Sequence, residues 1–340
     1  MEDNLIYSLE KYNNFDFLRH LLAFSVVWHH FSILSGYDYS FILLDIINSD
    51  IAVKAFFVIS GLLIWVSATR TTDWRSYFVK RFFRLYPALI LILLIVSVVS
   101  LFEFQQSTTD VIKYFTWNSI FLSFMNPCIG NVFDSNVLCA VNGSLWTLKI
   151  EVAYYVFVAF AVYKFKKHAY KLIVIFTVLS FLLESTLYFL PVSYTDITQL
   201  LHNQIPFKFY YFGMGVIFYN YYKKVTTATL FCLLVVGFIG WYLLKIDFIF
   251  LPLFVLSFVY IIAFKLPAFN FSKFGDLSYG MYIFHFPLIQ MFVYKGWFVN
   301  EIFVDFLMIM FILLLMSKLS WDFIENKSIH LSKVLSKKIT

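Results

Sequence analysis

The stretch FDFLRHLLAFSVVWHHFSIL, residues 15–34, places ionisable side chains inside a run that is otherwise apolar enough for lipid. Arg19 and His30 are eleven residues apart. At about 100° per residue they share one face of a helix, about 16 Å apart along its axis. A histidine in such a stripe can exchange a proton near neutral pH, as general base catalysis requires. A histidine that is hydrogen-bonded between helices for structural reasons fits the pair equally well.

Two further arginines, Arg81 and Arg84, lie three residues apart in YFVKRFFRLYP and therefore on one helix face. Guanidinium groups bind phosphates through paired donors, so the two suit a phosphorylated donor that arrives from the cytosol. Taken alone, the arginines are better explained by the preference of basic residues for the cytoplasmic side of a membrane.

A carboxylate stands in GSLWTLKIEVAYY, where Glu151 follows Ser144 by seven residues and Thr147 by four. These spacings put the three side chains close together on one helix face. We expect Glu151 to meet a cation or a histidine, with Ser144 and Trp146 lining the same cavity. The alternative is a structural ion pair between helices, for which Lys54 is one candidate partner.

A polar stripe recurs every three residues in LSYGMYIFHFPL, where it consists of Tyr279, Tyr282 and His285. We interpret it as a hydrogen-bonded brace that lines the cavity, with the following proline bending the helix.

The elements that position these residues are expected to be membrane helices. Hydrophobic residues make up 61% of the 340 and charged residues only 14%, whereas a soluble domain is about half apolar and a quarter charged. The sequence predicts an all-α bundle of about ten transmembrane helices in one domain over residues 1–340. The predicted spans are about 17–35, 51–69, 85–103, 145–163, 172–190, 207–222, 226–244, 248–264, 277–297 and 302–320. The first span has acidic residues ahead of it and no cleavage site after it, so we expect a retained helix.

Basic residues alternate along the connections, and they place both termini in the cytoplasm. The net charge of +6 is dispersed in this way and indicates no nucleic-acid partner. One outer connection, about 104–143, is long and contains NPCIGNVFDSNVLCAVNGS. Outside the cytoplasm, Cys128 and Cys139 can form a disulfide. Two free, buried thiols are equally compatible with the sequence.

Together these segments resemble the bacterial acyltransferase-3 family of multi-pass membrane acyltransferases. The matching motifs appear in the family's order: FDFLRHLLAFSVVWHHF, AVKAFFVISGLLI, KRFFRLYP, SLWTLKIE and LSYGMYIFHFPL. One departure follows Glu325, where the family often has a proline and this chain has Asn326 and Lys327. For this reason no role is assigned to Glu325. The resemblance is to a standalone form without the fused extracytoplasmic domain of many members.

The resemblance implies transfer of an acyl group, commonly acetyl from acetyl-coenzyme A, to a hydroxyl of a sugar or glycolipid. The implied acceptors are O-antigen, capsule or exopolysaccharide, or an undecaprenyl-linked precursor, at the bacterial inner membrane. The family's catalytic histidine corresponds to His30 and its motif arginine to Arg19, which would assist catalysis and donor binding. The paired arginines correspond to Arg81 and Arg84 at the coenzyme phosphates, and the glutamate to Glu151. No metal is expected, and the oligomeric state is left open.

A multi-pass glycolipid transporter or flippase is the main alternative, because ten spans with buried charges suit it too. Many transporters have two related halves with broken helices in corresponding places, and this sequence shows no such pairing. A non-catalytic membrane scaffold would not need the buried polar stripe.

Overall fold

The computed structural model describes residues 14–37, 48–189, 201, 204–269, 273 and 275–339. These residues form helices and loops, with no strand among them. The helices are α2 (Phe15–Ser35), α4 (Ser49–Arg70), α5 (Trp74–Phe102), α6 (Thr108–Ser119), α7 (Trp146–Ala159), α8 (Ala169–Tyr188), α10 (Ile205–Tyr219), α11 (Thr227–Phe238), α12 (Asp247–Phe264), α13 (Ser278–Lys295), α14 (Ile302–Ser320) and α15 (Asn326–Ile339).

The all-α membrane architecture is confirmed. Among the described residues, six helical stretches are long and apolar enough to cross a membrane: Phe15–Ser35, Ser49–Arg70, Trp74–Phe102, Gly143–Tyr188, Asp247–Phe264 and Ile302–Ile339. Helices occupy all ten predicted span positions, although the number of crossings stays a prediction. So does the cytoplasmic placement of both termini; residues 1–13 lie outside the described part.

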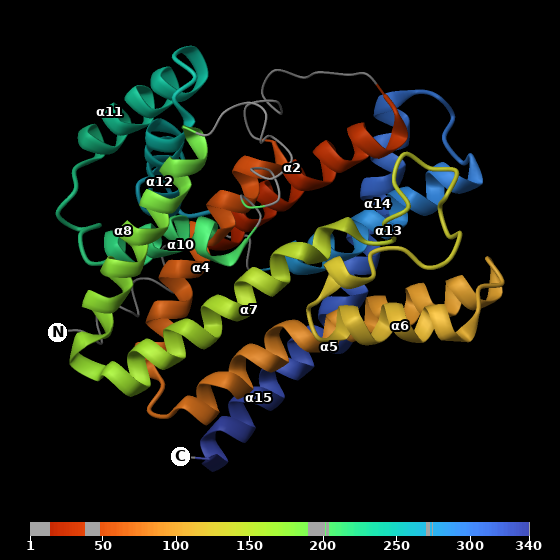
Figure 1. Ribbon diagram of the computed structural model, residues 1–340, viewed down its shortest axis with the longest axis horizontal. Coiled ribbons are helices and arrows are strands. Elements are labelled where there is room, and N and C mark those ends of the chain that lie inside the picture. The colour runs from red at the N-terminus through yellow and green to blue at the C-terminus, as the bar shows by residue number, and fades with distance from the viewer. Residues whose placement is uncertain are drawn as a thin grey trace. The chain divides into compact units, whose positions relative to one another are not determined.

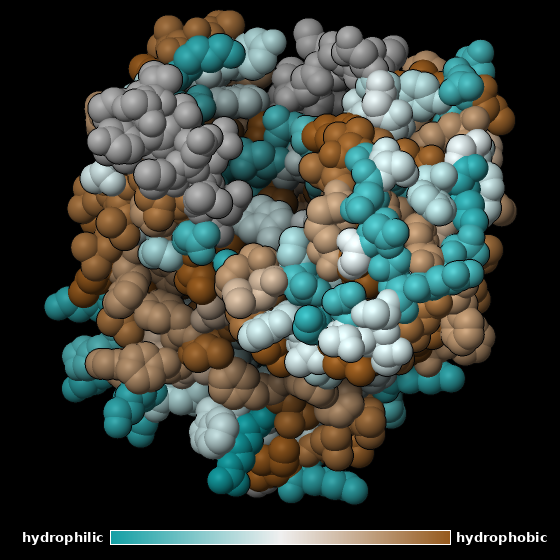
Figure 2. All heavy atoms as spheres, turned by 45° about the vertical axis from the view of Figure 1, so that its right-hand side comes forward, coloured by the Kyte–Doolittle hydropathy of each residue, from teal (hydrophilic) through white to brown (hydrophobic). Residues whose placement is uncertain are grey.

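Large apolar side chains are exposed on many helices, including Val98 on α5, Leu182 on α8 and Phe311 on α14. Hydrophobic residues, brown in Figure 2, cover much of the face shown. A soluble protein rarely exposes contiguous apolar surface of this kind, whereas lipid-facing helices require it.

The chain divides into two compact units. The first consists of Met1–Arg19, Val53–Trp74 and Ala153–Lys273, and the second of His20–Ala52, Arg75–Val152 and Phe274–Thr340. The helices α2, α4 and α7 each contribute residues to both units. The single domain expected over 1–340 stays a prediction.

Within the first unit, glycines let α4 and α10 approach closely. A Cβ added at Gly61 of α4 would lie 1.9 Å from the carbonyl oxygen of Phe212. A Cβ added at Gly215 of α10 would lie 2.0 Å from the carbonyl oxygen of Val58. Small residues at such contacts allow backbones to pack directly, which is a common way for membrane helices to associate.

The second unit holds α5, α6, α13, α14 and α15 together with most of α2. At 29 residues, α5 is about 43 Å long and exceeds the hydrocarbon core of a bilayer, which is about 30 Å thick. Figure 1 shows α15 beside the beginning of α5, where the Ser76 hydroxyl donates to the carbonyl of Ser336.

The long connection over about 104–143, whose position on the outer side stays a prediction, contains the helix α6, which the span pattern did not predict. Its start follows capping rules: the Ser107 hydroxyl oxygen accepts from the backbone N–H of Asp110 at 3.1 Å and donates to its carboxylate at 2.7 Å. The sequence Ser-Thr-Thr-Asp therefore carries a signal that could have revealed this helix.

Candidate functional site

The centre of the candidate site is a pair of histidines from α2 and α13. His30 Nδ1 lies 2.9 Å from His285 Nε2, and the two rings stack with centroids 5.0 Å apart. His285 is fully buried, and its Nδ1 lies 3.0 Å from the backbone carbonyl oxygen of Met281. The Phe286 ring meets His30 edge-on at 5.3 Å. The structure thus joins the predicted catalytic histidine to a residue that we had interpreted as a brace.

Local chemistry fixes the part of α13 that carries His285. Pro287 lacks an N–H, so the carbonyl of Ile283, four residues earlier, loses its helical partner. The side chain of Asn142 donates to this carbonyl at 2.9 Å. A buried carbonyl therefore stays satisfied, and the segment before α7 is fastened to α13 next to the histidine.

The residues predicted to share a face of α7 meet the tyrosine stripe of α13. The Tyr282 hydroxyl lies 2.7 Å from the Thr147 hydroxyl and donates to the carbonyl of Ser144 at 3.2 Å. Glu151 is near enough to Tyr279 and Tyr282 to act on both electrostatically. The partner that the structure gives to His30 is His285, and the orientation of His30 by Glu151 stays a prediction.

Arg84 lies in a cluster of charges. Its guanidinium pairs with Asp276 and lies 3.7 Å from the Glu325 carboxylate, which is only 1% exposed. Ser320 donates to the other oxygen of Glu325 at 2.8 Å. Asp276 and Glu325 are therefore the site residues that the sequence analysis missed. The family resemblance pointed to Glu325, but Asn326 and Lys327, which stand where the family often has a proline, argued against using it.

Four further predicted residues lie on α5, α7, α2 and α4. The Arg81 guanidinium lies 6.0 Å from the ring centroid of the tyrosine four residues earlier in α5. Trp146 is half-buried at the start of α7. Arg19 lies in α2, one helix with His30. Lys54 is buried, and its ammonium lies 5.8 Å from the Tyr211 ring in the first unit. The pairing of Lys54 with Glu151 stays a prediction.

The outer connection is tied to α13 beyond the histidine. Cys128 and Cys139 form a disulfide, the pairing that the sequence had left open. Within the closed loop, the carbonyl of Leu138 accepts from the Gln290 side chain at 2.6 Å, and Asn136 donates to the Gln290 side-chain oxygen at 2.9 Å. The disulfide loop is therefore attached to the same helix that carries His285.

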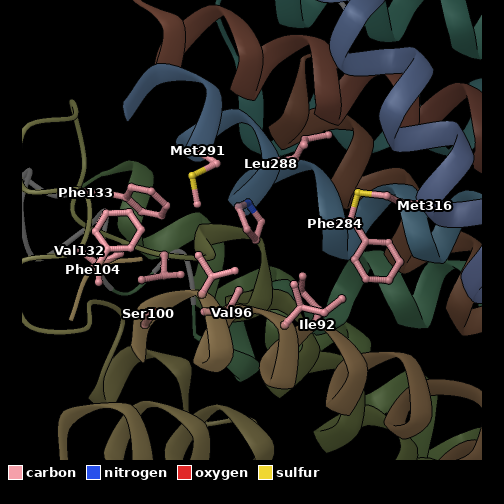
Figure 3. Close-up of a pocket in the computed structure, with 14 residues that line it drawn as sticks. Ile92, Val96, Ser100, Phe104, Val132, Phe133, Phe284, Leu288, Met291 and Met316 are labelled. Carbon is pink, nitrogen blue, oxygen red and sulfur yellow. The ribbon is translucent and has the colours of Figure 1, made fainter. Parts of the chain in front are cut away.

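A cavity of about 150 Å³ lies in the second unit between α5, α13, α14 and the outer connection. The residues that line it are apolar except for Ser100. Figure 3 shows Phe104 and Phe133 at one side and Phe284 and Met316 at the other. None of the predicted site residues lines this cavity.

Metal ligands do not gather in the described part of the chain. Among residues 14–37, 48–189, 201, 204–269, 273 and 275–339, no group of three or more His, Cys, Asp or Glu side chains is placed to hold a metal ion.

Comparison with known proteins shows the family to which the sequence belongs. The acyltransferase-3 family, described as an acyltransferase domain, matches residues 12–322. An O-acetyl transferase from Shigella phage Sf6 is 30% identical over 159 residues, a match that covers 45% of this chain and 47% of the phage protein, or about half of each. Nodulation protein 10 from Rhizobium leguminosarum bv. viciae is 23% identical over 315 residues, which cover 84% of this chain and 85% of that protein. No solved structure matches the chain. Because the family match runs through nearly all of the sequence and includes His30, His285, Arg81 and Arg84, the chain belongs to the acyltransferase-3 family.

Proposed function

We propose that this protein transfers an acyl group, in the simplest case acetyl, from acyl-coenzyme A to a hydroxyl of a cell-surface glycan or its lipid-linked precursor. The observation that carries the proposal is the hydrogen-bonded pair of His30 and His285 inside an acyltransferase domain. The name of the phage relative, an O-acetyl transferase, supports acetyl as the group and oxygen as the acceptor atom.

His30 is the proposed general base. It takes the proton of the acceptor hydroxyl while the hydroxyl oxygen attacks the thioester carbonyl. The new C–O bond forms, the C–S bond breaks, and the departing thiolate receives the proton. A positioned base contributes about 10²–10⁴-fold to such a step.

The donor is proposed to bind through Arg81, with Arg19 further along. Both guanidinium groups fit phosphates by their chemistry, since each presents paired donors. Arg84 fits less well, because its charge already faces the carboxylates of Asp276 and Glu325. We therefore propose that Arg84 holds α5 in place for its neighbour Arg81, and direct phosphate binding by Arg84 remains a prediction.

A lipid-linked acceptor is supported by the apolar cavity. An apolar cavity of about 150 Å³ stays dry and accepts small apolar ligands. The cavity between α5 and α13 has this size and this kind of lining, so it suits part of a prenyl chain. We place the protein in the cytoplasmic membrane of a bacterium, where such precursors are assembled.

The test compares the surface glycans of cells that carry the wild-type gene, no gene, or His30→Ala. Mass spectrometry should find an acyl group on one sugar in the first case only. A matched variant, His29→Ala, changes the neighbouring histidine and should keep the modification. A glycan acylated at wild-type yield by His30→Ala contradicts the assignment of the base. Equal glycans with and without the gene contradict the proposed function as a whole.

A further inference from the structure

The hydrogen-bond partners of the two histidines indicate which nitrogen of each ring carries a proton. The partner of His285 Nδ1 is the backbone carbonyl oxygen of Met281, 3.0 Å away. A carbonyl oxygen only accepts hydrogen bonds, so the proton of this bond belongs to His285 Nδ1. A neutral imidazole carries one N–H, and His285 Nε2 is therefore an acceptor.

The same counting fixes the proton of His30. Its Nδ1 lies 2.9 Å from the acceptor His285 Nε2, so this bond needs a proton on His30 Nδ1. His30 also donates to the backbone carbonyl of Val26, four residues earlier in α2, and we assign this contact to the same Nδ1–H, because Nδ1 is the ring nitrogen nearer the backbone. His30 Nε2 is then left without a proton and can act as a base. We infer that His285 is a positioning residue, which holds neutral His30 in the Nδ1–H tautomer and thereby makes Nε2 the reactive nitrogen.

The opposite assignment requires a doubly protonated His285 that donates to His30 Nδ1. It would place a full positive charge on a side chain with 0% exposure. Burying a charge in this way is costly. The neutral arrangement satisfies both nitrogens of His285 without a charge, since one donates to Met281 and the other accepts from His30.

The surroundings hold the two rings in this arrangement. Asn142 supports the carbonyl of Ile283, two residues before His285, and the rings of His30 and Phe286 meet edge-on at 5.3 Å. The two imidazole planes are inclined by only 23°, which suits a hydrogen bond between nitrogens at their edges.

The inference rests on the proposed function and specifies its proton transfer. When His30 Nε2 takes the hydroxyl proton, the imidazolium keeps its Nδ1–H bond to His285 Nε2. This bond becomes charge-assisted and therefore stronger. As the C–S bond breaks, the proton on Nε2 passes to the thiolate, and His30 returns to the same tautomer. His285 touches neither substrate in this sequence.

The experiment compares two substitutions that differ in one property. His285→Phe keeps a ring but offers no acceptor, whereas His285→Gln offers a side-chain oxygen that can accept from His30 Nδ1–H. We expect kcat to fall about 100-fold or more in the first, in keeping with loss of a general base, with KM for acetyl-coenzyme A little changed. The second should retain kcat within about tenfold of wild type. His29→Gln, on the next residue of α2, serves as the matched control.

A second measurement does not depend on turnover. In protein labelled with ¹⁵N-histidine, the imidazole nitrogen shifts of His30 should report an Nδ1–H tautomer in wild type and His285→Gln, and a changed tautomer population in His285→Phe. This readout also applies if a variant is only partly folded, because the signals of folded molecules can be measured separately.

The outcomes separate this inference from the function on which it rests. Full activity in His30→Ala contradicts the proposed base. Inactive His30→Ala together with fully active His285→Phe contradicts only the role of His285. Equal loss in His285→Phe and His285→Gln, with the His30 tautomer unchanged, also contradicts it and leaves His285 with a packing role.

Discussion

Replacing Arg84 with methionine should destabilise the protein in the absence of any substrate. Methionine keeps the length and apolar stem of the side chain but removes its charge. It leaves the carboxylates of Asp276 and Glu325 without this cation, and Glu325 is 1% exposed. Both carboxylates then lose an opposite charge in a space with little water.

The size of the effect follows from the distances. Unit charges 3.7 Å apart, as for Arg84 and Glu325, interact by about 4 kcal/mol at the effective dielectric constant of about 20 that suits protein sites. Removal of one partner from a buried pair costs roughly 3–5 kcal/mol. At about 2.1 cal/mol/K per residue, a chain of 340 residues shifts by about 1.4 °C per kcal/mol, so the apparent melting temperature should fall by roughly 4–7 °C.

The assay is thermal unfolding of purified protein in detergent, followed by tryptophan fluorescence. The triple variant Arg84→Met/Asp276→Asn/Glu325→Gln should recover most of the loss, because it removes both carboxylate charges together with the cation. Arg81→Met, one turn earlier in α5, should change the melting temperature much less. An Arg84→Met protein as stable as wild type, or a triple variant no more stable than the single one, would refute the reasoning and return Arg84 to a purely donor-binding role.

Three further outcomes are expected. Gly215→Ala would place a Cβ 2.0 Å from a carbonyl oxygen of α4. Thermal unfolding should show that this variant destabilises the first unit by roughly 1–3 kcal/mol. An equally stable alanine variant would contradict the close helix contact. The Cys128–Cys139 disulfide joins residues with a sequence separation of 11 and should stabilise the protein by about 3 kcal/mol through chain entropy. Maleimide labelling of unfolded, non-reduced protein should modify only the third cysteine. Modification of all three cysteines would disprove the bond. Partial burial, and next the hydrogen bond to Asp305, raise the pKa of Tyr37 to about 12. The resulting stability is fully present below the ordinary pKa of about 10 and is lost as pH rises from there through about 12; Asp305→Asn should lower the tyrosinate midpoint in a spectroscopic titration, and an unchanged midpoint would contradict the contact.

Much of the fold was predictable because it depends on local patterns. Long apolar runs predicted ten spans, and the structure has a helix at each of them. The alternation of basic residues predicted only their orientation. The start of α6 was missed because its capping sequence, Ser107 to Asp110, lies in a stretch that was treated only as a loop. The helix α15 was missed for a different reason. It continues from α14 through a π-helical segment, Trp321–Glu325, and its sequence is polar and amphipathic, unlike that of a membrane-spanning helix.

The candidate site was predictable by residue type but not by pairing. Spacing identified His30 and His285 separately, since each lies in an apolar run with other polar groups. Their hydrogen bond joins residues 255 positions apart, and the short-range periodicity of the sequence does not predict such a contact. The same limit applies to Arg84 and Asp276, which are 192 positions apart. Sequence could therefore name the ionisable residues and their helix faces, while the choice of partners depends on how the helices pack.

The helix α13 is held on both sides of His285 by different chemistry. Asp276, just before the helix, pairs with Arg84, and Gln290 near the other end binds the carbonyls of the disulfide loop. A helix restrained at two such points cannot slide or rotate easily to meet a substrate. His285 therefore stays in place as the partner of the proposed base, His30 of α2, and both the thioester and the hydroxyl have to travel to this pair. For such an enzyme, we expect the alignment of thioester and hydroxyl to depend on how the two substrates enter and not on a movement of this helix.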